Sequence, residues 1–268
     1  MSKIRAIALA GLGILTSRIG QAQQPTETTF SVDGRVALHS FMALSDAHLE
    51  QLADLLHFFA ATDAARSGDW QRIRGPLGQV HAMSVPAVLW YARPNGNYWT
   101  VQQDGRVAGS LSDRAYFPRV LRGQTILGDL VVSHSTNRNT AIVAVPVRGR
   151  NNAVVGVLGA SVHLDSLGTL ILKEMGGLEQ RLIFFAIDST PIGALNSDPN
   201  LIFTEPMKLG DETMRAAFTG MLARTEGTAV YNFRGHQRTV LFHRSAVTGW
   251  WYALGLVEQG PEVTGGSR

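Results

Sequence analysis

Residues 113–167 read DRAYFPRVLRGQTILGDLVVSHSTNRNTAIVAVPVRGRNNAVVGVLGASVHLDSL and give the clearest structural pattern in the chain. An arginine-aromatic helix start is followed by three apolar runs rich in valine, at 129–133, 140–147 and 153–162. Short runs of this kind, bounded by polar turn residues, are typical of strands. The stretch therefore predicts a short helix, a three-stranded antiparallel meander and an exit helix over 165–176.

The chain upstream predicts a helical lead-in and then a hairpin. A helix is expected from Ser45, whose hydroxyl suits an N-cap, and its apolar face is formed by Leu49, Leu52, Leu56 and Phe59. A second helix is expected over 70–80. Two strands, at 87–92 and 97–102, flank the turn Arg93-Pro94-Asn95-Gly96, which is a typical hairpin signal.

The chain downstream repeats this order of elements in outline. Strands are expected at 181–188, 201–205, 228–233, 237–244 and 249–258. Asp211 is expected to cap a helix that reaches about residue 224, as Ser112 and Asp113 are expected to cap the short helix over 116–122. Neither half alternates helices and strands as a parallel sheet requires. The expected fold class is α+β: a long N-terminal helix, then two units, each an antiparallel sheet of about five strands with flanking helices.

The first 22 residues have the three-part layout of a secretory signal peptide. Lys3 and Arg5 precede an apolar run at 6–15, and small residues close the segment at Ala22, after which cleavage is expected. The apolar run is shorter than the roughly 20 residues that cross a bilayer, and Arg18 interrupts its extension. An uncleaved membrane anchor is the alternative. The expected location of the mature protein is periplasmic or secreted.

The composition argues against several classes of partner and site. The chain has 24 basic and 21 acidic residues, and three of the basic ones, Lys3, Arg5 and Arg18, lie in the predicted signal peptide. A basic surface for nucleic acid is therefore not expected. The chain has no cysteine, so disulfides, a thiolate nucleophile, a zinc-thiolate site and a lipid-modified cysteine are excluded.

Motifs of known catalytic machineries are also missing from the sequence. It contains no G-x-S-x-G, H-E-x-x-H, S-x-x-K or P-loop pattern. His39, His48 and His57 step by nine residues, which alternates helix faces and makes no pair of metal ligands. No catalytic residue, metal or cofactor is expected, and the protein is not expected to be an enzyme.

The quoted stretch resembles the membrane-distal half of double Cache sensor domains. These are tandem PAS-like sheets on a long N-terminal helix, found outside the membrane in bacterial chemoreceptors and sensor kinases. The helical lead-in and the segment TVLFHRSAVTGWWYALGLVE also fit that layout, so the resemblance covers about 46–258. It divides the chain into a signal peptide (1–22), a flexible start and long helical lead-in (23–80), a membrane-distal-type unit (81–167), a membrane-proximal-type unit (168–258) and a tail (259–268).

The resemblance implies a ligand site in the first unit, between its sheet and the helix opened by the arginine-aromatic motif. Arg114, Tyr116 and Phe117 occupy that motif. The fork of an arginine can bind a carboxylate through two charge-assisted hydrogen bonds, and aromatic walls exclude water. Arg114 and Tyr116 are expected to contact the ligand and Phe117 to pack the helix onto the sheet. The alternative is a surface Arg114 and purely structural aromatics.

One position departs from the pattern of the amino-acid-binding members. Those members place an aspartate on the strand before the exit helix to hold the ammonium group, and alignment by the glycines puts Ser161 there. A serine cannot neutralise a buried ammonium group. Tyr116 also stands where tryptophan is usual. The expected ligand is a small carboxylate or another neutral-to-acidic metabolite, and not a standard α-amino acid.

Further candidates lie on neighbouring strands, with core packing as the alternative for each. Ser133 and His134 end one strand of the meander and could reach a ligand edge. Tyr91, Tyr98 and Trp99 lie on the opening hairpin. Alternation sends Tyr91 to one face of its strand and Trp90 to the other. In the second unit Trp250, Trp251 and Tyr252 are expected to form a packing cluster, with a second pocket as the alternative.

Three functions remain open from the sequence. The first is an exported double Cache protein that binds a metabolite in its first unit and signals through a membrane sensor kinase or chemoreceptor. The second is a structural or interaction module without a ligand, and the third an unrecognised hydrolase. Selective thermal stabilisation by a metabolite separates the first two. The resemblance allows a homodimer through the N-terminal helix, which no residue pattern decides.

Overall fold

The computed structural model describes residues 33–82, 85–176 and 182–257. The predicted signal peptide, residues 23–32 and the predicted tail lie outside these ranges. Among the described residues, no helix combines the length and the hydrophobicity that crossing a membrane requires.

Helix α1, Gly34–Ala60, begins well before the predicted start at Ser45. Its N-cap is Asp33, whose carboxylate accepts a hydrogen bond from the backbone N–H of Arg35 at 2.8 Å. Ser45 is a completely buried residue inside the helix, and its hydroxyl shares a hydrogen bond of 2.9 Å with that of Tyr252. The prediction was wrong because a capping serine and a serine bonded to a distant tyrosine have the same local sequence signature.

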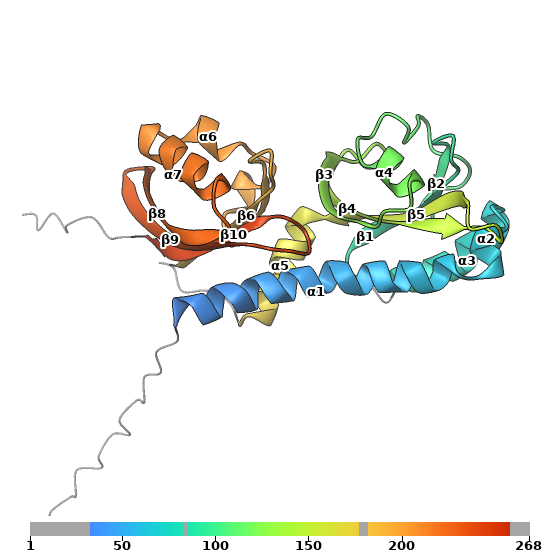
Figure 1. The fold of residues 1–268 in the computed structure, drawn as a ribbon, viewed down its shortest axis with the longest axis horizontal. Coiled ribbons are helices and arrows are strands. Elements are labelled where there is room, and N and C mark those ends of the chain that lie inside the picture. Colours follow the sequence, from blue (N-terminus) through green and yellow to red (C-terminus); the bar gives the residue numbers. More distant parts are fainter. Residues whose placement is uncertain (1–32, 83–84, 177–181, 258–268) are drawn as a thin grey trace, which may run out of the picture. The chain divides into compact units, whose positions relative to one another are not determined.

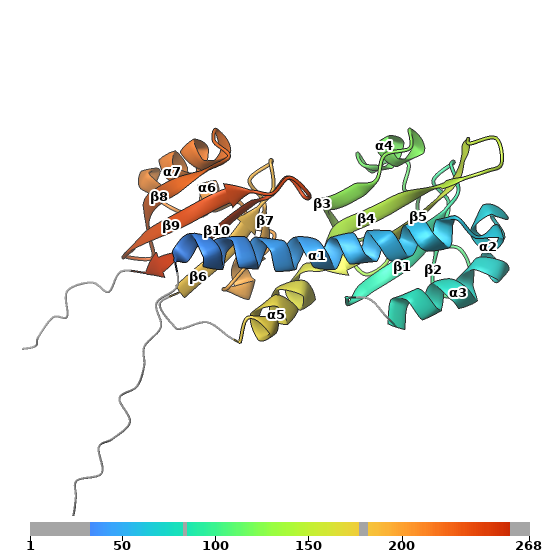
Figure 2. The same cartoon turned by 60° about the horizontal axis from the view of Figure 1, so that its bottom comes forward.

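The first sheet is antiparallel, with strand order β2-β1-β5-β4-β3. Its strands are β1 (Ala87–Ala92), β2 (Tyr98–Thr100), β3 (Ile126–Val132), β4 (Asn139–Arg148) and β5 (Val154–His163). The flanking helices are α2 (Asp63–Arg66), α3 (Trp70–Ala82), α4 (Phe117–Leu121) and α5 (Leu164–Glu174). Helix α4 lies on one face of the sheet, and helices α1 and α3 lie on the other (Figure 1 and Figure 2). The predicted meander and exit helix are confirmed.

The short helix α4 differs from its predicted form at its start. Its N-cap is Tyr116, which makes no side-chain capping bond, and a proline occupies the first turn. Ser112 and Asp113 therefore do not cap it, contrary to prediction. Pro118 suits the first turn because the missing N–H and the fixed φ angle cost nothing there.

The second sheet repeats the topology, with strand order β7-β6-β10-β9-β8. Its strands are β6 (Leu182–Ile187), β7 (Gly193–Asn196), β8 (Glu226–Phe233), β9 (His236–Arg244) and β10 (Trp251–Val257). The 3₁₀ turn η1 (Pro199–Leu201) and the helices α6 (Pro206–Leu209) and α7 (Glu212–Leu222) follow β7. The fold class is confirmed as α+β with two antiparallel five-stranded sheets and a long N-terminal helix.

Two details of the second unit test the sequence reading. Asp211 caps α7 as predicted, since its carboxylate accepts from the backbone N–H groups of Thr213 and Met214. The strand predicted over 201–205 is wrong. Phe203 has a φ of 63°, which an extended strand does not tolerate, and the second strand is the four-residue β7 instead.

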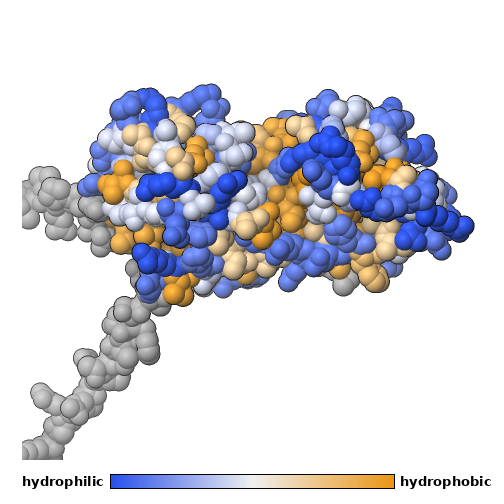
Figure 3. Space-filling view, in the orientation of Figure 1, coloured by the Kyte–Doolittle hydropathy of each residue, from blue (hydrophilic) through white to orange (hydrophobic). Residues whose placement is uncertain are grey.

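Helix α1 contacts both sheets. Ser45 and Asp46 bond to Tyr252 of β10. The residue before β10 contacts the first sheet, because the indole N–H of Trp250 donates to the carbonyl of Gly128 in β3 at 3.0 Å. The face drawn in Figure 3 mixes hydrophilic residues with small hydrophobic areas, and scattered exposed apolar residues of that kind are normal on a folded protein.

Candidate functional site

A small hollow of about 10 Å³ lies on the α4 side of the first sheet. Its walls come from β1 to β5 and from the loop that leads into α4. Apolar side chains contribute Trp90, Leu111, Val131 and Ile142. The polar lining consists of Tyr98, Arg114, Tyr116, Ser133, His134, Ser135 and Ser161. The hollow has room for about one water molecule at most.

Arg114 is positioned by the end of strand β3. Its Nη2 donates to the carbonyl of Val132 at 2.8 Å, and its side chain is 19% exposed. Its Nε lies 3.9 Å from the carboxylate of Asp113, which is largely exposed. A guanidinium carries five N–H donors in a fixed fork, so the anchor on Val132 holds the group while using one of them.

Two tyrosines place hydroxyl groups near this arginine. Tyr98 and Tyr116 are both buried, and burial raises the pKa of each, while the charge of Arg114 opposes the increase. The rings of Tyr116 and Trp90 lie 6.4 Å apart. Both phenols therefore stay protonated at neutral pH and can donate a hydrogen bond to an acceptor that enters the hollow.

The turn between β3 and β4 supplies the hydroxyl and imidazole groups on the other side. The backbone N–H of Ser133 donates to the carbonyl of Arg138 at 2.9 Å, and the hydroxyls of Ser133 and Ser135 lie 3.2 Å apart. His134 approaches the carboxylate of Asp113 to 3.7 Å. Ser161 on β5 is buried and faces the same hollow. No acidic side chain is part of the lining among the described residues.

The structure brings together six of the nine residues considered from the sequence. These are Tyr98, Arg114, Tyr116, Ser133, His134 and Ser161. Phe117 is buried in the cluster between α4 and the sheet, as expected for a packing residue.

Tyr91 and Trp99 lie on the opposite face of the sheet and do not line the hollow. Tyr91 belongs to the core between the sheet and α1, and Trp99 stacks on Trp70 of α3 at 6.5 Å. Because Trp90 and Tyr98 alternate with them along the strands, these two residues face the hollow instead. Ser135 was missed, although it lies next to His134, which the sequence did indicate.

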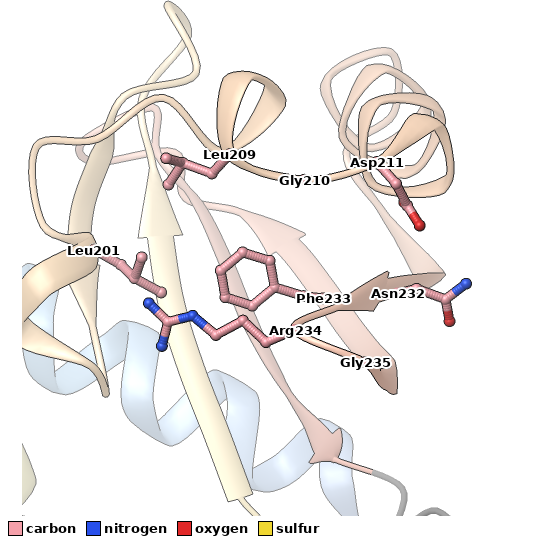
Figure 4. Close-up of a pocket in the computed structure, with 8 residues that line it drawn as sticks. All are labelled: Leu201, Leu209, Gly210, Asp211, Asn232, Phe233, Arg234 and Gly235. Carbon is pink, nitrogen blue, oxygen red and sulfur yellow. The ribbon is translucent and has the colours of Figure 1, made fainter.

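The second unit carries a larger hollow of about 730 Å³, which sequence reasoning did not single out. It opens between the start of α7 and the β8–β9 turn, as Figure 4 shows. Its lining is Leu201, Leu209, Gly210, Asp211, Asn232, Phe233, Arg234 and Gly235. Within the described ranges, no group of three or more histidine, cysteine or acidic residues could hold a metal ion.

Comparison with known proteins finds relatives by structure alone. No family model matches the chain, and no curated protein matches it. The ligand-binding domain of the Pseudomonas fluorescens chemoreceptor CtaA, in complex with L-alanine, has a TM-score of 0.66 at 12% identity and covers 84% of this chain and 96% of its own. The ligand-binding domain of the Pseudomonas aeruginosa chemoreceptor PctC, in complex with GABA, has a TM-score of 0.58 at 16% identity, over 84% and 95%.

A third solved structure is the periplasmic sensory domain of the Campylobacter jejuni chemoreceptor Tlp1. Its TM-score is 0.61 at 12% identity, and the match covers 88% of this chain and 96% of that domain. At such identities the likeness establishes the fold. The chain has the tandem PAS-like fold of double Cache sensor domains, and the resemblance noted in the sequence is confirmed at that level.

Proposed function

We propose that this protein is an extracytoplasmic small-molecule sensor that binds a metabolite in the hollow of its first unit. The observation that carries the proposal is the convergence of Arg114, two buried tyrosine hydroxyls and the hydroxyls of Ser133 and Ser161 on one hollow beside α4. The fold supports it, because the three compared structures are described as ligand-binding or sensory domains. A hollow of about 10 Å³ requires its walls to move apart when a ligand enters.

The lining favours a small carboxylate over an α-amino acid. CtaA and PctC were solved with L-alanine and GABA, and both ligands carry an ammonium group. Here Ser161 occupies the position at which, by the resemblance, the amino-acid-binding members carry an aspartate. The described lining contains no acidic side chain. An ammonium group buried without a counter-charge costs several kcal/mol. Arg114 and the two phenols instead supply donors that suit an anion.

Strand β3 connects this hollow to the rest of the protein. Arg114 donates to the carbonyl of Val132 at one end of the strand, and Arg119 of α4 forms an ion pair with Asp129 near its middle. Gly128, next to Asp129, accepts the hydrogen bond from Trp250 of the second unit. A ligand that recruits Arg114 would therefore favour one arrangement of β3 relative to the second unit, as a population shift. A membrane sensor kinase or a chemoreceptor is the proposed recipient.

Replacing Arg114 with methionine is expected to weaken ligand binding about 10- to 100-fold, because a charge-assisted hydrogen bond contributes roughly 1.5–3 kcal/mol. The probes are acetate, lactate, succinate and the common amino acids, screened first by thermal shift and then by calorimetric titration. Arg106→Met is the matched control, since Arg106 makes one polar contact in the same unit, to Asn97 at 3.0 Å.

Two results would contradict the proposal. Equal affinity of a carboxylate for the wild type and for Arg114→Met, with both proteins folded, removes Arg114 from the site. Micromolar binding of an unmodified α-amino acid overturns the ligand class. Failure of every probe to stabilise the protein favours an interaction module without a ligand.

A further inference from the structure

The second unit contains an apolar cavity whose described lining includes a single charged residue. The cavity lies between the sheet β6–β10 and the helices α6 and α7, and its volume is about 20 Å³. Apolar side chains form most of its wall, among them Phe185, Met214, Phe218 and Phe233. The charged residue is Arg238 of strand β9.

Strand alternation turns Arg238 inward. It shares its face of β9 with Val240 and Phe242, both of which are buried in the core of the second unit. Its Nε is buried and makes no hydrogen bond, and among the described residues no carboxylate forms an ion pair with it. A buried N–H group of a cation without a partner carries a free-energy penalty that an acceptor would remove.

The surroundings of Arg238 suit an anion. Its guanidinium carbon lies 4.6 Å from the centre of the Phe233 ring. The hydroxyl of Tyr231 is close by: burial raises the pKa of Tyr231, and the positive charge of Arg238 and a hydrogen bond between the two side chains oppose that increase. The phenol therefore stays protonated and offers a second donor beside the guanidinium.

Phe233 separates this cavity from the open hollow of the second unit. Both spaces share Leu201, Leu209 and Phe233 as walls. In Figure 4 the Phe233 ring points toward Leu209, and the side chain of Arg234 extends toward Leu201. Arg234 is held outside by an ion pair with Asp198 at 3.1 Å. A rotation of Phe233, or of the half-exposed Leu209, would join the cavity to the hollow.

We propose that this cavity is a second ligand site, which takes a small carboxylate with a short apolar tail. The carboxylate binds side-on to Nε and one Nη of Arg238, which is the bidentate geometry that arginine favours. The tail packs among Met214, Phe218 and Phe185 after Phe233 has rotated. The site is separate from the one assigned to the first unit and does not depend on it.

The test uses straight-chain carboxylates from acetate to hexanoate, each paired with its uncharged amide. Binding is measured by calorimetric titration, and saturation-transfer NMR reports contact with the tail. The affinity of the carboxylates is expected to rise with the tail from acetate to butyrate, and the amides are expected not to bind. Arg238→Met should weaken butyrate binding at least about tenfold. Arg244→Met is the matched control, because Arg244 also lies on β9 over an aromatic ring but outside the cavity.

Two further variants test the proposal independently of Arg238→Met. Leu209→Trp fills the entrance at a residue that is 48% exposed, and it should block butyrate even if Arg238→Met fails to fold. Arg114→Met should leave butyrate binding at this site unchanged. Equal affinity in the wild type and in folded Arg238→Met overturns the proposal, as does a carboxylate series that does not bind at all. Loss of butyrate binding in Arg114→Met but not in Arg238→Met also overturns the proposal, and it assigns the carboxylate to the first unit.

Discussion

Trp250→Ala is expected to lower the free energy of unfolding by about 4 kcal/mol, the range of tryptophan truncations in protein cores. Trp250 is 1% exposed and is among the largest fully buried side chains of the described residues. Its removal leaves a cavity at the junction of the two sheets and deprives the carbonyl of Gly128 of its donor. Chemical denaturation, followed by circular dichroism, measures the loss.

The local backbone explains why the indole fits there. Gly128 has a φ of 90° and lies at a bulge in β3, where the pairing with β4 shifts by one residue. A Cβ atom at that position would lie 3.1 Å from the indole of Trp250. Only glycine therefore satisfies both the positive φ and the close approach of the ring.

Trp250→Phe separates the hydrogen bond from the apolar contact. It keeps an aromatic ring but removes the N–H donor, so a smaller loss of about 1–2 kcal/mol is expected. The specific readout is amide exchange in β3, which should become faster although the substitution lies in the second unit. Trp251→Phe is the control, because Trp251 bonds to the carbonyl of Arg224 within its own unit. Unchanged exchange in β3 would show that this contact does not couple the units.

The strands of the first sheet were predictable because their apolar runs are long and rich in valine. β4 and β5 begin and end within one or two residues of the expected bounds. The four-residue β7 was missed because it carries no run of that kind, and the apolar residues 201–203 after it pack without forming a strand. The start of α1 was missed because Ser45 resembles a cap.

The candidate site was predictable where a motif, an alignment or the end of a predicted strand identified a residue. Arg114 came from the arginine-aromatic motif and Ser161 from the spacing of glycines. Every residue of β1 is buried, so the sequence does not show which face of that strand meets α4. For that reason, the face of the sheet on which Tyr91 lies could not be predicted. Arg238 was overlooked, although its alternation with buried valine and phenylalanine residues on β9 was a usable signal.

Asp46→Ala is expected to cost about 3 kcal/mol, because it removes the acceptor of three hydroxyl groups at once. Asp46 lies on α1 and is 6% exposed. One carboxylate oxygen accepts from Ser245 at 2.7 Å, and the other accepts from Tyr252 at 3.0 Å and from Thr248 at 3.3 Å. No cation neutralises the group among the described residues. Asp54→Ala, at an exposed position of the same helix, is the control for helix propensity.

Asparagine keeps only one of the two acceptor oxygens of the carboxylate, which makes Asp46→Asn informative. The hydroxyl oxygen of Ser245 already accepts from the backbone N–H groups of Val247 and Thr248, and its proton points to Asp46. The single amide oxygen of asparagine can accept from Ser245 or from Tyr252 and Thr248, but not from both sides, and its N–H groups then face hydroxyls that donate to the carboxylate in the wild type. Asp46→Asn is therefore expected to be destabilised by about 2 kcal/mol despite its similar shape. Wild-type stability in this variant would show that the segment from Ser245 to Thr248 does not depend on the carboxylate.

The destabilisation by Asp46→Ala is also expected to depend on pH. Burial raises the pKa of Asp46 above its ordinary value of 3.8, and the hydrogen bonds from Ser245, Tyr252 and Thr248 only partly oppose this shift. The folded protein then binds the proton more tightly than the unfolded chain does. The resulting stabilisation is complete below the unfolded pKa and is lost as pH rises through the folded pKa.

The difference between wild type and Asp46→Ala should therefore be larger near pH 4 than at pH 7, measured by denaturation at constant ionic strength. Subtracting the free energy of unfolding of the variant from that of the wild type cancels the contributions of all other titrating groups that the substitution leaves undisturbed. The opposite trend would mean that the three hydroxyl donors outweigh burial and hold the pKa of Asp46 below its ordinary value. The carboxylate would then stabilise the contact between α1 and β10 most strongly in its charged form, at neutral pH.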